Sequence, residues 1–234
     1  MARSDAYKPT LESPVEKYLT WSSNDKCFAY YSKQLNKMVQ VPLPIKLIHF
    51  DEFATIKGFH DKSGSSIYSN EVKSVKFEEL NVRSFKGGEL AKGLYQDIKS
   101  KVNELGGSYH TSLYALLGDE IVNIQMKGSA VQAWSDFTKE GRKSFLTNYI
   151  EVNSAIEAKK GSVKYSTPEF KIGGAIESKV ATAADVKYDE LVAYFAARKA
   201  NASQAQVSAA TVTDYPDAEE VLAPSKDEFD ALPF

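Results

Sequence analysis

The feature that most constrains the fold is a succession of short apolar segments separated by turn residues. Between residues 27 and 85 these segments run from three to seven residues, which is the length of short strands. They cover Cys27–Tyr31, Lys37–Val41, Ile45–Phe50, Ala54–His60, Ile67–Ser69 and Leu80–Phe85. In the fourth segment Thr55, Lys57 and Phe59 alternate with Ala54, Ile56 and Gly58, the period of a strand with two different faces. Close spacing of such segments favours a small barrel or sandwich.

A second group of predicted strands follows an expected helix. Gly87-Gly88 opens that helix over residues 89–105, where apolar residues recur at steps of three and four, and Gly106-Gly107 ends it. The apolar positions are Leu90, Leu94, Ile98, Val102 and Leu105. The later strands are expected at Tyr109–Leu117, Glu120–Met126, Tyr149–Ala158 and Ser162–Tyr165, with Phe170 and Ile172 extending the sheet.

Two more helices are indicated by capping signals. Ser129 and Gln132 have the spacing of a capping box, ahead of a helix that carries Trp134 on its apolar side, where we expect core packing. Thr182 and Asp185 have the same spacing ahead of a helix at 183–199. Its apolar residues Tyr188, Leu191, Val192 and Phe195 fall on one face.

These elements predict a mainly β fold with helical insertions, and an OB-fold-like barrel is our choice. That barrel has five strands and commonly carries a helix between the third and fourth. We expect an N-terminal arm at 1–20, an OB-fold-like domain at 21–200, a flexible linker at 201–224 and an acidic tip at 225–234. The linker segment is rich in Ala, Ser, Thr, Val and Gln, and it contains too little apolar surface to offset the entropy of ordering.

Composition argues against a membrane protein and against most catalytic classes. The sequence has no apolar run near the ~20 residues that span a bilayer and no secretory signal at its N-terminus, so we expect a cytoplasmic protein. Cys27 is the single cysteine, which excludes an intrachain disulfide and a thiolate zinc site. No nucleotide-binding loop or metalloprotease motif occurs, and His49, His60 and His110 have no partner at ligand spacing. We therefore expect a non-enzyme that needs no cofactor and no metal.

Aromatic and basic residues lie close together at several predicted hairpins, which is the combination that single-strand binders use. Cationic side chains hold phosphates, while rings stack on exposed bases without reading their identity. We predict that single-stranded DNA contacts Tyr30, Tyr31, Lys33, Lys37, Phe59, Lys62, Tyr68, Arg83, Phe85, Lys86, Lys164 and Tyr165. About half of these rings are expected to be packing residues, since one of two adjacent strand residues must face inward.

The C-terminal tip is the most specific motif. Residues 201–234 hold seven acids and one base, whereas residues 1–200 hold 24 acids and 28 bases. Within the tip, acids precede an apolar end that carries the chain's terminal carboxylate. Such an end suits a protein pocket that is apolar and rimmed by Arg or Lys. The residues expected to bind a partner are Asp227, Glu228, Asp230, Leu232, Pro233 and Phe234.

Here the sequence resembles bacterial single-stranded DNA-binding proteins, whose tails end in acids followed by Ile-Pro-Phe. It is also similar to phage replication proteins that combine an OB core with an acidic C-terminus. Phe229 and Ala231 interrupt the acidic run, and Leu232 stands where those tails have Ile. The resemblance implies sequence-nonspecific single-stranded DNA binding in replication, recombination and repair. It also implies recruitment of nucleases, helicases, primases or a polymerase through the tip.

Two other classes remain open from sequence alone. A non-enzymatic β-domain protein of a virion or assembly has a similar composition, although it has no need for acids before a terminal Leu-Pro-Phe. A small nuclease would require a carboxylate cluster that binds Mg²⁺. If the DNA-binding hypothesis holds, the tethered acidic tip is also expected to visit the DNA site and compete with DNA.

Overall fold

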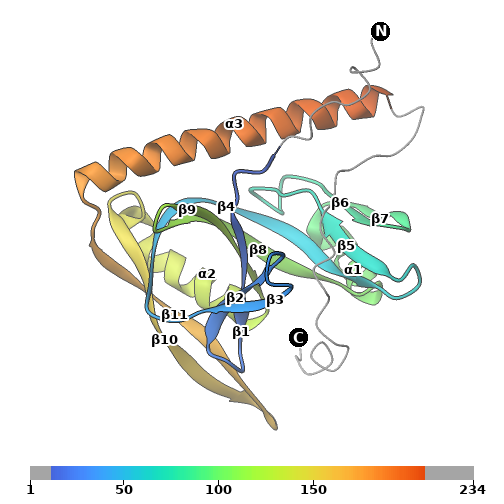
Figure 1. Ribbon diagram of the computed structural model, residues 1–234. Coiled ribbons are helices and arrows are strands. Elements are labelled where there is room, and N and C mark those ends of the chain that lie inside the picture. Colours follow the sequence, from blue (N-terminus) through green and yellow to red (C-terminus); the bar gives the residue numbers. More distant parts are fainter. Residues whose placement is uncertain (1–11, 209–234) are drawn as a thin grey trace.

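The chain folds around one mixed β-sheet, shown in Figure 1. The computed structural model describes residues 12–208, and that part of the chain contributes eleven strands. The strands are β1 (Lys17–Ser22), β2 (Cys27–Ser32), β3 (Lys37–Val41), β4 (Ile45–His60), β5 (Ser65–Ser69), β6 (Leu80–Ser84), β7 (Gly88–Gly93), β8 (Gly107–Leu117), β9 (Glu120–Lys127), β10 (Asn148–Lys160) and β11 (Val163–Ala175). The helices are α1 (Tyr95–Glu104), α2 (Ser129–Gly141), the 3-10 turn η2 (Arg142–Ser144) and α3 (Ser178–Ser208). The mainly β fold with helical insertions is therefore confirmed.

The strands follow the order β3-β2-β1-β9-β8-β4-β5-β6-β7, and the β10–β11 hairpin branches from the start of β4. All neighbours are antiparallel except β1 and β9, which run parallel with Leu19 opposite Ile124. The predicted N-terminal arm is thus wrong at its end, because Lys17–Thr20 belong to β1. A parallel pair between segments a hundred residues apart leaves no local pattern from which to predict it.

Strand β4 connects two halves of the molecule. It pairs with β10 and β8 at its start and with β8 and β5 at its end, across an irregularity between His49 and Asp51. We expected two strands here, and the structure has one strand of 16 residues. A bulge bends a strand without ending its pairing, so the break in the apolar pattern is a bend and not a loop.

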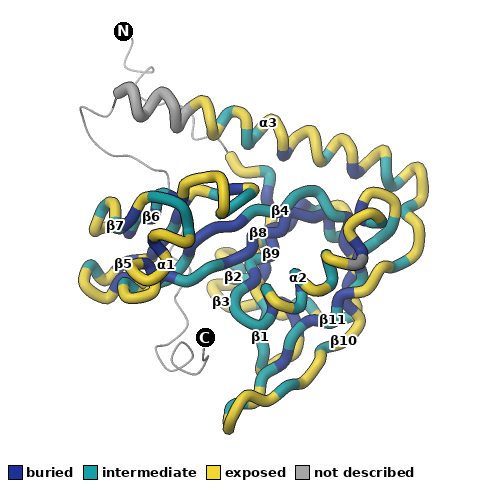
Figure 2. Tube along the Cα trace, turned by 180° about the vertical axis from the view of Figure 1, so that it is seen from behind, coloured by how far each residue is buried: buried dark blue, intermediate teal, exposed yellow. Residues whose placement is uncertain are grey.

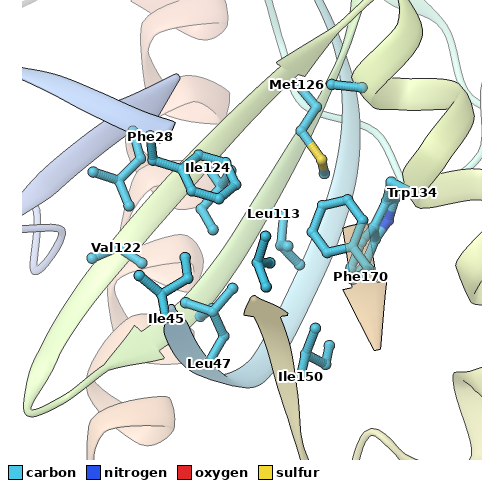
Figure 3. Close-up of a cluster of buried hydrophobic side chains, with 14 of the residues drawn as sticks. Phe28, Ile45, Leu47, Leu113, Val122, Ile124, Met126, Trp134, Ile150 and Phe170 are labelled. Atoms are coloured by element: carbon cyan, nitrogen blue, oxygen red, sulfur yellow. The ribbon is translucent and has the colours of Figure 1, made fainter. Parts of the chain in front are cut away.

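The first half of the sheet curves around a core that α2 closes at one end. Side chains from β1, β2, β4, β8, β9, β10 and β11 point toward one another there (Figure 3). Trp134 on α2 is only 3% exposed, and its indole Nε1 donates to Glu52 Oε2 at 2.8 Å. The expected core role of Trp134 is confirmed.

The second half has its own core on the same side of the sheet, covered by α1. Ile56, Ile67 and Val82 pack there with Ile98 and Val102 of the helix. The predicted helix over 89–105 is wrong in its first turn and a half, because Gly88–Gly93 form strand β7 beside β6. Pairing with β6 satisfies the backbone of this segment, and that long-range gain outweighs the weak helical period of Leu90 and Leu94.

The opposite side of the sheet, called here the outer face, is partly covered by α3. Leu191 and Ala184 of α3 are buried against Ile48, Tyr114 and Leu116 of β4 and β8. In Figure 2 the outward side of α3 is largely exposed, whereas β4, β8 and β9 are mostly buried or half-buried. Within residues 12–208, no helix is long and apolar enough to cross a membrane.

The curved half does not close into a barrel by strand pairing among the described residues. Instead, two residues near the β1–β2 turn hold β11. Ser23 Oγ accepts from Ser166 N and Ser23 O accepts from Ser166 Oγ, each at 2.7 Å, while Trp21 Nε1 donates to Ser166 O at 2.9 Å. The closed OB barrel that we expected is not confirmed, because the sheet stays open between these edges.

Neither predicted capping box forms. The residue before α2 is Gly128, without a side-chain cap, and Gln132 donates to Asp136 instead of reaching back. Helix α3 begins at Ser178, so Thr182 lies in its first turns and donates to the carbonyl of Ser178. This helix also continues to Ser208, into the segment predicted as a linker; residues 209–224 and the tip lie outside the described residues.

Candidate nucleic-acid interface

The part of the outer face beyond α3 carries aromatic and basic residues in two rows. In antiparallel strands, directly opposed residues point to the same side, as do residues two apart. Lys57 on β4 is opposite Tyr68 on β5, and Tyr68 is opposite Arg83 on β6. In the next row Phe59 is opposite Ser66, whose carbonyl accepts from Phe85 N at 3.0 Å. We call Lys57, Phe59, Tyr68, Arg83 and Phe85 the aromatic–basic face.

The two ring-bearing positions at the end of this face are open to solvent. Phe85 is 55% exposed and Phe59 is 37% exposed, although Phe59 lies within β4 and Phe85 directly follows β6. The residues behind them, Ile56, Ile67 and Val82, supply the core beneath α1. These exposed rings are therefore not needed to fill that core. Phe59 lies on β4, and Phe85 lies in the turn directly after β6, two strands away in the sheet.

Two neighbouring turns place further cations at the same end. Lys62 lies in the β4–β5 turn and Lys86 in the β6–β7 turn, and both residues are exposed. A polar cluster ties the turns together: Lys86 N donates to Ser65 Oγ at 3.1 Å, and Ser63 Oγ donates to Ser84 Oγ at 3.3 Å. The sheet thus brings together six of the predicted DNA-binding residues, from three separate sequence segments, and adds Lys57 to them.

The carboxylate of Glu71, at the border of this face, binds the C-terminal part of α3. Glu71 Oε1 accepts from Ser112 Oγ at 2.6 Å, Tyr114 OH reaches both carboxylate oxygens at 2.9 Å, and Arg198 Nη1 donates to Oε2 at 3.2 Å. The ring of Phe195, one turn before Arg198, packs edge-on against Tyr114. Helix α3 therefore ends only ten residues after Arg198, whose contact with Glu71 borders the aromatic–basic face.

Lys57 is the most perturbed cation of the face. Burial lowers its pKa from 10.5 to about 8, an effect that the charge of Arg198 increases and that of Glu71 opposes. A lysine with a pKa of about 8 still carries its charge at neutral pH. Keeping this charge in a buried position costs desolvation free energy. Groups with pKa values perturbed in this way cluster at functional sites.

His49 and His110 contribute no positive charge at neutral pH. Burial lowers the pKa of His110 and of His49 to about 4. His110 Nδ1 is 3.1 Å from the carbonyl oxygen of Ser108, and the ring of His49 stacks on Trp134. Both rings serve packing and hydrogen bonding. Within residues 12–208, no three His, Cys, Asp or Glu side chains gather as a metal site.

Four predicted residues belong to the β2–β3 hairpin, and they do not share one side of it: Tyr30, Tyr31, Lys33 and Lys37. Tyr30 packs against the core, and the ammonium of Lys17 lies 5.3 Å from its ring centroid. Tyr31 points to the other side and hydrogen-bonds Asn36 within the hairpin. Lys33 and Lys37 are exposed at the turn and on β3. These residues lie across the sheet from the aromatic–basic face, with β1, β9 and β8 between them and β4.

The last predicted pair, Lys164 and Tyr165, lies near the end of the β10–β11 hairpin. Tyr165 is opposite Ala158 and Lys164 is opposite Lys159. This hairpin is remote in the sheet from β5 and β6, so it is not part of the same surface. The six tip residues, Asp227, Glu228, Asp230, Leu232, Pro233 and Phe234, lie outside the described residues.

Sequence reasoning missed Lys57, Glu71 and Arg198. The signal for Lys57 was present, because its alternation with Phe59 places both on one side of a strand. Nothing local points to Glu71 and Arg198, which lie 127 residues apart in the sequence and meet only in the fold.

Comparisons with known proteins identify no relative for this arrangement. No family model matches the chain, and neither the curated proteins nor the solved structures include a match.

Proposed function

We propose that the protein binds single-stranded DNA without sequence preference through the aromatic–basic face, in DNA replication, recombination or repair. The observation that carries the proposal is the pair of solvent-exposed rings, Phe59 on β4 and Phe85 directly after β6, beside Lys57 and Arg83. Rings of this kind stack on unpaired bases, and the adjacent cations hold the phosphates.

The electrostatics of the face support a moderate, salt-sensitive affinity. Lys57, Arg83, Lys62 and Lys86 are cationic, while Glu89 lies opposite Arg83 on the edge strand. Each phosphate neutralised on a single strand contributes a slope of about −0.7 to the logarithmic dependence of affinity on salt. Four such contacts would give a slope near −3.

The OB-fold analogy remains part of the proposal at a coarser level. A curved sheet with a helix at one end supports it, together with an interface on an open face of the sheet. The tip fits the second half of the function, which is recruitment of replication or repair proteins through an acidic, apolar terminus. A structural or assembly protein is the alternative, and it would not need the exposed ring and cation pairs.

Fluorescence titration of the full chain with oligo-dT, oligo-dA and duplex DNA at two salt concentrations tests the proposal. We expect tight binding to both single strands, weak binding to the duplex, and a loss of affinity with salt. The absence of single-strand binding at low salt, both for the full chain and for a chain that ends near Ala200, would rule the function out and leave the assembly alternative.

Removal of residues 225–234 should tighten binding to oligo-dT by a few-fold at about 50 mM salt. The reason is that the three acids of the tip compete with phosphates for the same cations, and α3 delivers the tail beside the aromatic–basic face. The difference from the full chain should shrink as salt rises, because the Debye length falls to about 3 Å at 1 M. Unchanged or weaker affinity of the shortened chain at low salt would contradict this competition.

A further inference from the structure

A groove lies between α2 and β11, away from the aromatic–basic face. It has a volume of about 420 Å³ and is lined by Phe137, Gly141, Phe170, Lys171 and Ile172. We call it the α2–β11 groove. A volume of this size is within the range of pockets that bind small ligands and peptide side chains.

Aromatic rings form its floor. The ring of Phe137 stacks on that of Phe170, with centroids 5.7 Å apart, and on that of Phe145 at 5.3 Å. Ile172 at the rim is 38% exposed, although it is an isoleucine on a regular strand. A side chain on Gly141 would come within 3.0 Å of Ile172, so the glycine keeps the groove from being filled by the protein itself.

Basic residues lie near the groove, and one of them, Lys171, is part of its lining. Arg142 and Lys143 follow Gly141 directly, and Lys139 precedes it by two residues; all four are exposed. Lys171, Arg142 and Lys139 each pair with a carboxylate, whereas among the described residues none pairs with Lys143. The site therefore matches an occupant that combines an aromatic or aliphatic end with negative charge.

We propose that the occupant is the tip of the same chain, with Leu232, Pro233 and Phe234 in the groove and the acids of the tip toward the neighbouring basic residues Lys171 and Lys143. Phe234 offers a ring, and Asp227, Glu228 and Asp230 precede it. A buried phenylalanine removes roughly 150–250 Å² from water, which makes it a suitable anchor for a short segment.

The chain is long enough for this docking. The groove lies near the start of α3, since Ile176 N donates to Thr147 O just before the helix. Helix α3 has 31 residues and carries the chain about 46 Å away from that end. The 26 residues after Ser208 span up to about 90 Å when extended, nearly twice that length.

Docking would keep the tip from other proteins until they compete for it. The tip cannot occupy the groove and the DNA face at the same time, so the two proposals describe alternative positions of one segment. The proposal does not depend on DNA binding, and its test contains no DNA, so a failure of one leaves the other unaffected.

The test is amide NMR of the full-length ¹⁵N-labelled protein in four variants. Phe234→Ala should displace the amide signals of Gly141 and of Phe170–Ile172, whereas Tyr215→Ala, an aromatic change elsewhere in the tail, should not. Ile172→Glu should move the Phe234 amide to its position in a synthetic peptide of residues 225–234. Its matched control is Ile156→Glu, which changes another exposed isoleucine of the same hairpin, and it should leave Phe234 unmoved.

Two results would overturn the proposal. Groove amides that are the same in the wild type and in Phe234→Ala would show that the tip does not occupy the groove. Displacements that grow with protein concentration would assign the groove to the tip of a second copy and exclude docking within one chain. Loss of the displacements when salt is raised is expected, because the acids contribute through exposed charges.

Discussion

Phe85→Ala should weaken binding to oligo-dT by roughly 5- to 150-fold, which corresponds to the roughly 1–3 kcal/mol that one stacked base contributes. The ring of Phe85 is 55% exposed and lies outside the core beneath α1, so its removal should leave the stability of the protein nearly unchanged. Fluorescence titration of the purified variant gives the affinity, and thermal unfolding verifies the fold.

The salt dependence separates stacking from charge. Because Phe85 has no charge, its replacement should shift the affinity at every salt concentration without changing the slope. Phe77→Ala is the matched control, since Phe77 is 85% exposed in the connection between β5 and β6 and lies outside the aromatic–basic face. Equal losses in the two variants, or no loss in Phe85→Ala, would exclude Phe85 as a stacking platform.

Lys57→Met should stabilise the protein at neutral pH by up to about 3 kcal/mol and weaken DNA binding by roughly tenfold at ~50 mM salt. Folding lowers the pKa of Lys57 from 10.5 to about 8, so the folded protein holds this charge at an energetic cost that methionine does not carry. The lost ammonium should reduce the magnitude of the salt slope by about one. Urea unfolding and oligo-dT titration measure the two effects.

The pH dependence gives the direction of the stability effect. Below pH 8 both the folded and the unfolded chain hold the proton of Lys57, so the full penalty is present. Between pH 8 and 10.5 only the unfolded chain keeps the proton, so the stability of the wild type rises relative to Lys57→Met and the difference closes. Lys76→Met is the control at an exposed position. A Lys57→Met protein that is less stable than the wild type at pH 7 would contradict this account.

The local parts of the fold follow from the sequence. The turns at Gly118 and Gly161, both with positive φ, fall between the strands that the sequence predicts on either side, and β8 and β9 pair antiparallel, as do β10 and β11. Trp134 could be assigned to the core because its helix has a clear apolar side. In each case the interaction that determines the structure lies within a few residues of the pattern that predicts it.

Non-local parts were missed for the opposite reason. Strand β7 depends on β6, β1 depends on β9, and the Glu71–Arg198 contact depends on how α3 crosses the sheet. The candidate site shows the same division. Phe59, Tyr68, Arg83 and Phe85 were named from sequence, but only the register of three strands brings them onto one face. Their separation from Tyr31 and Lys164 follows from the sheet order.

The hydrogen bonds from Ser23 and Trp21 to Ser166 make a seam in the curved half of the sheet. Elsewhere that half is held by continuous backbone ladders, whereas this join consists of four hydrogen bonds that each involve a side chain. Parting the join would break no strand pair and would leave every ladder intact. The β10–β11 hairpin is therefore held by backbone pairing where β10 meets β4, and by side-chain hydrogen bonds alone where β11 meets the β1–β2 turn. The least costly opening of this half of the sheet separates β11 from that turn.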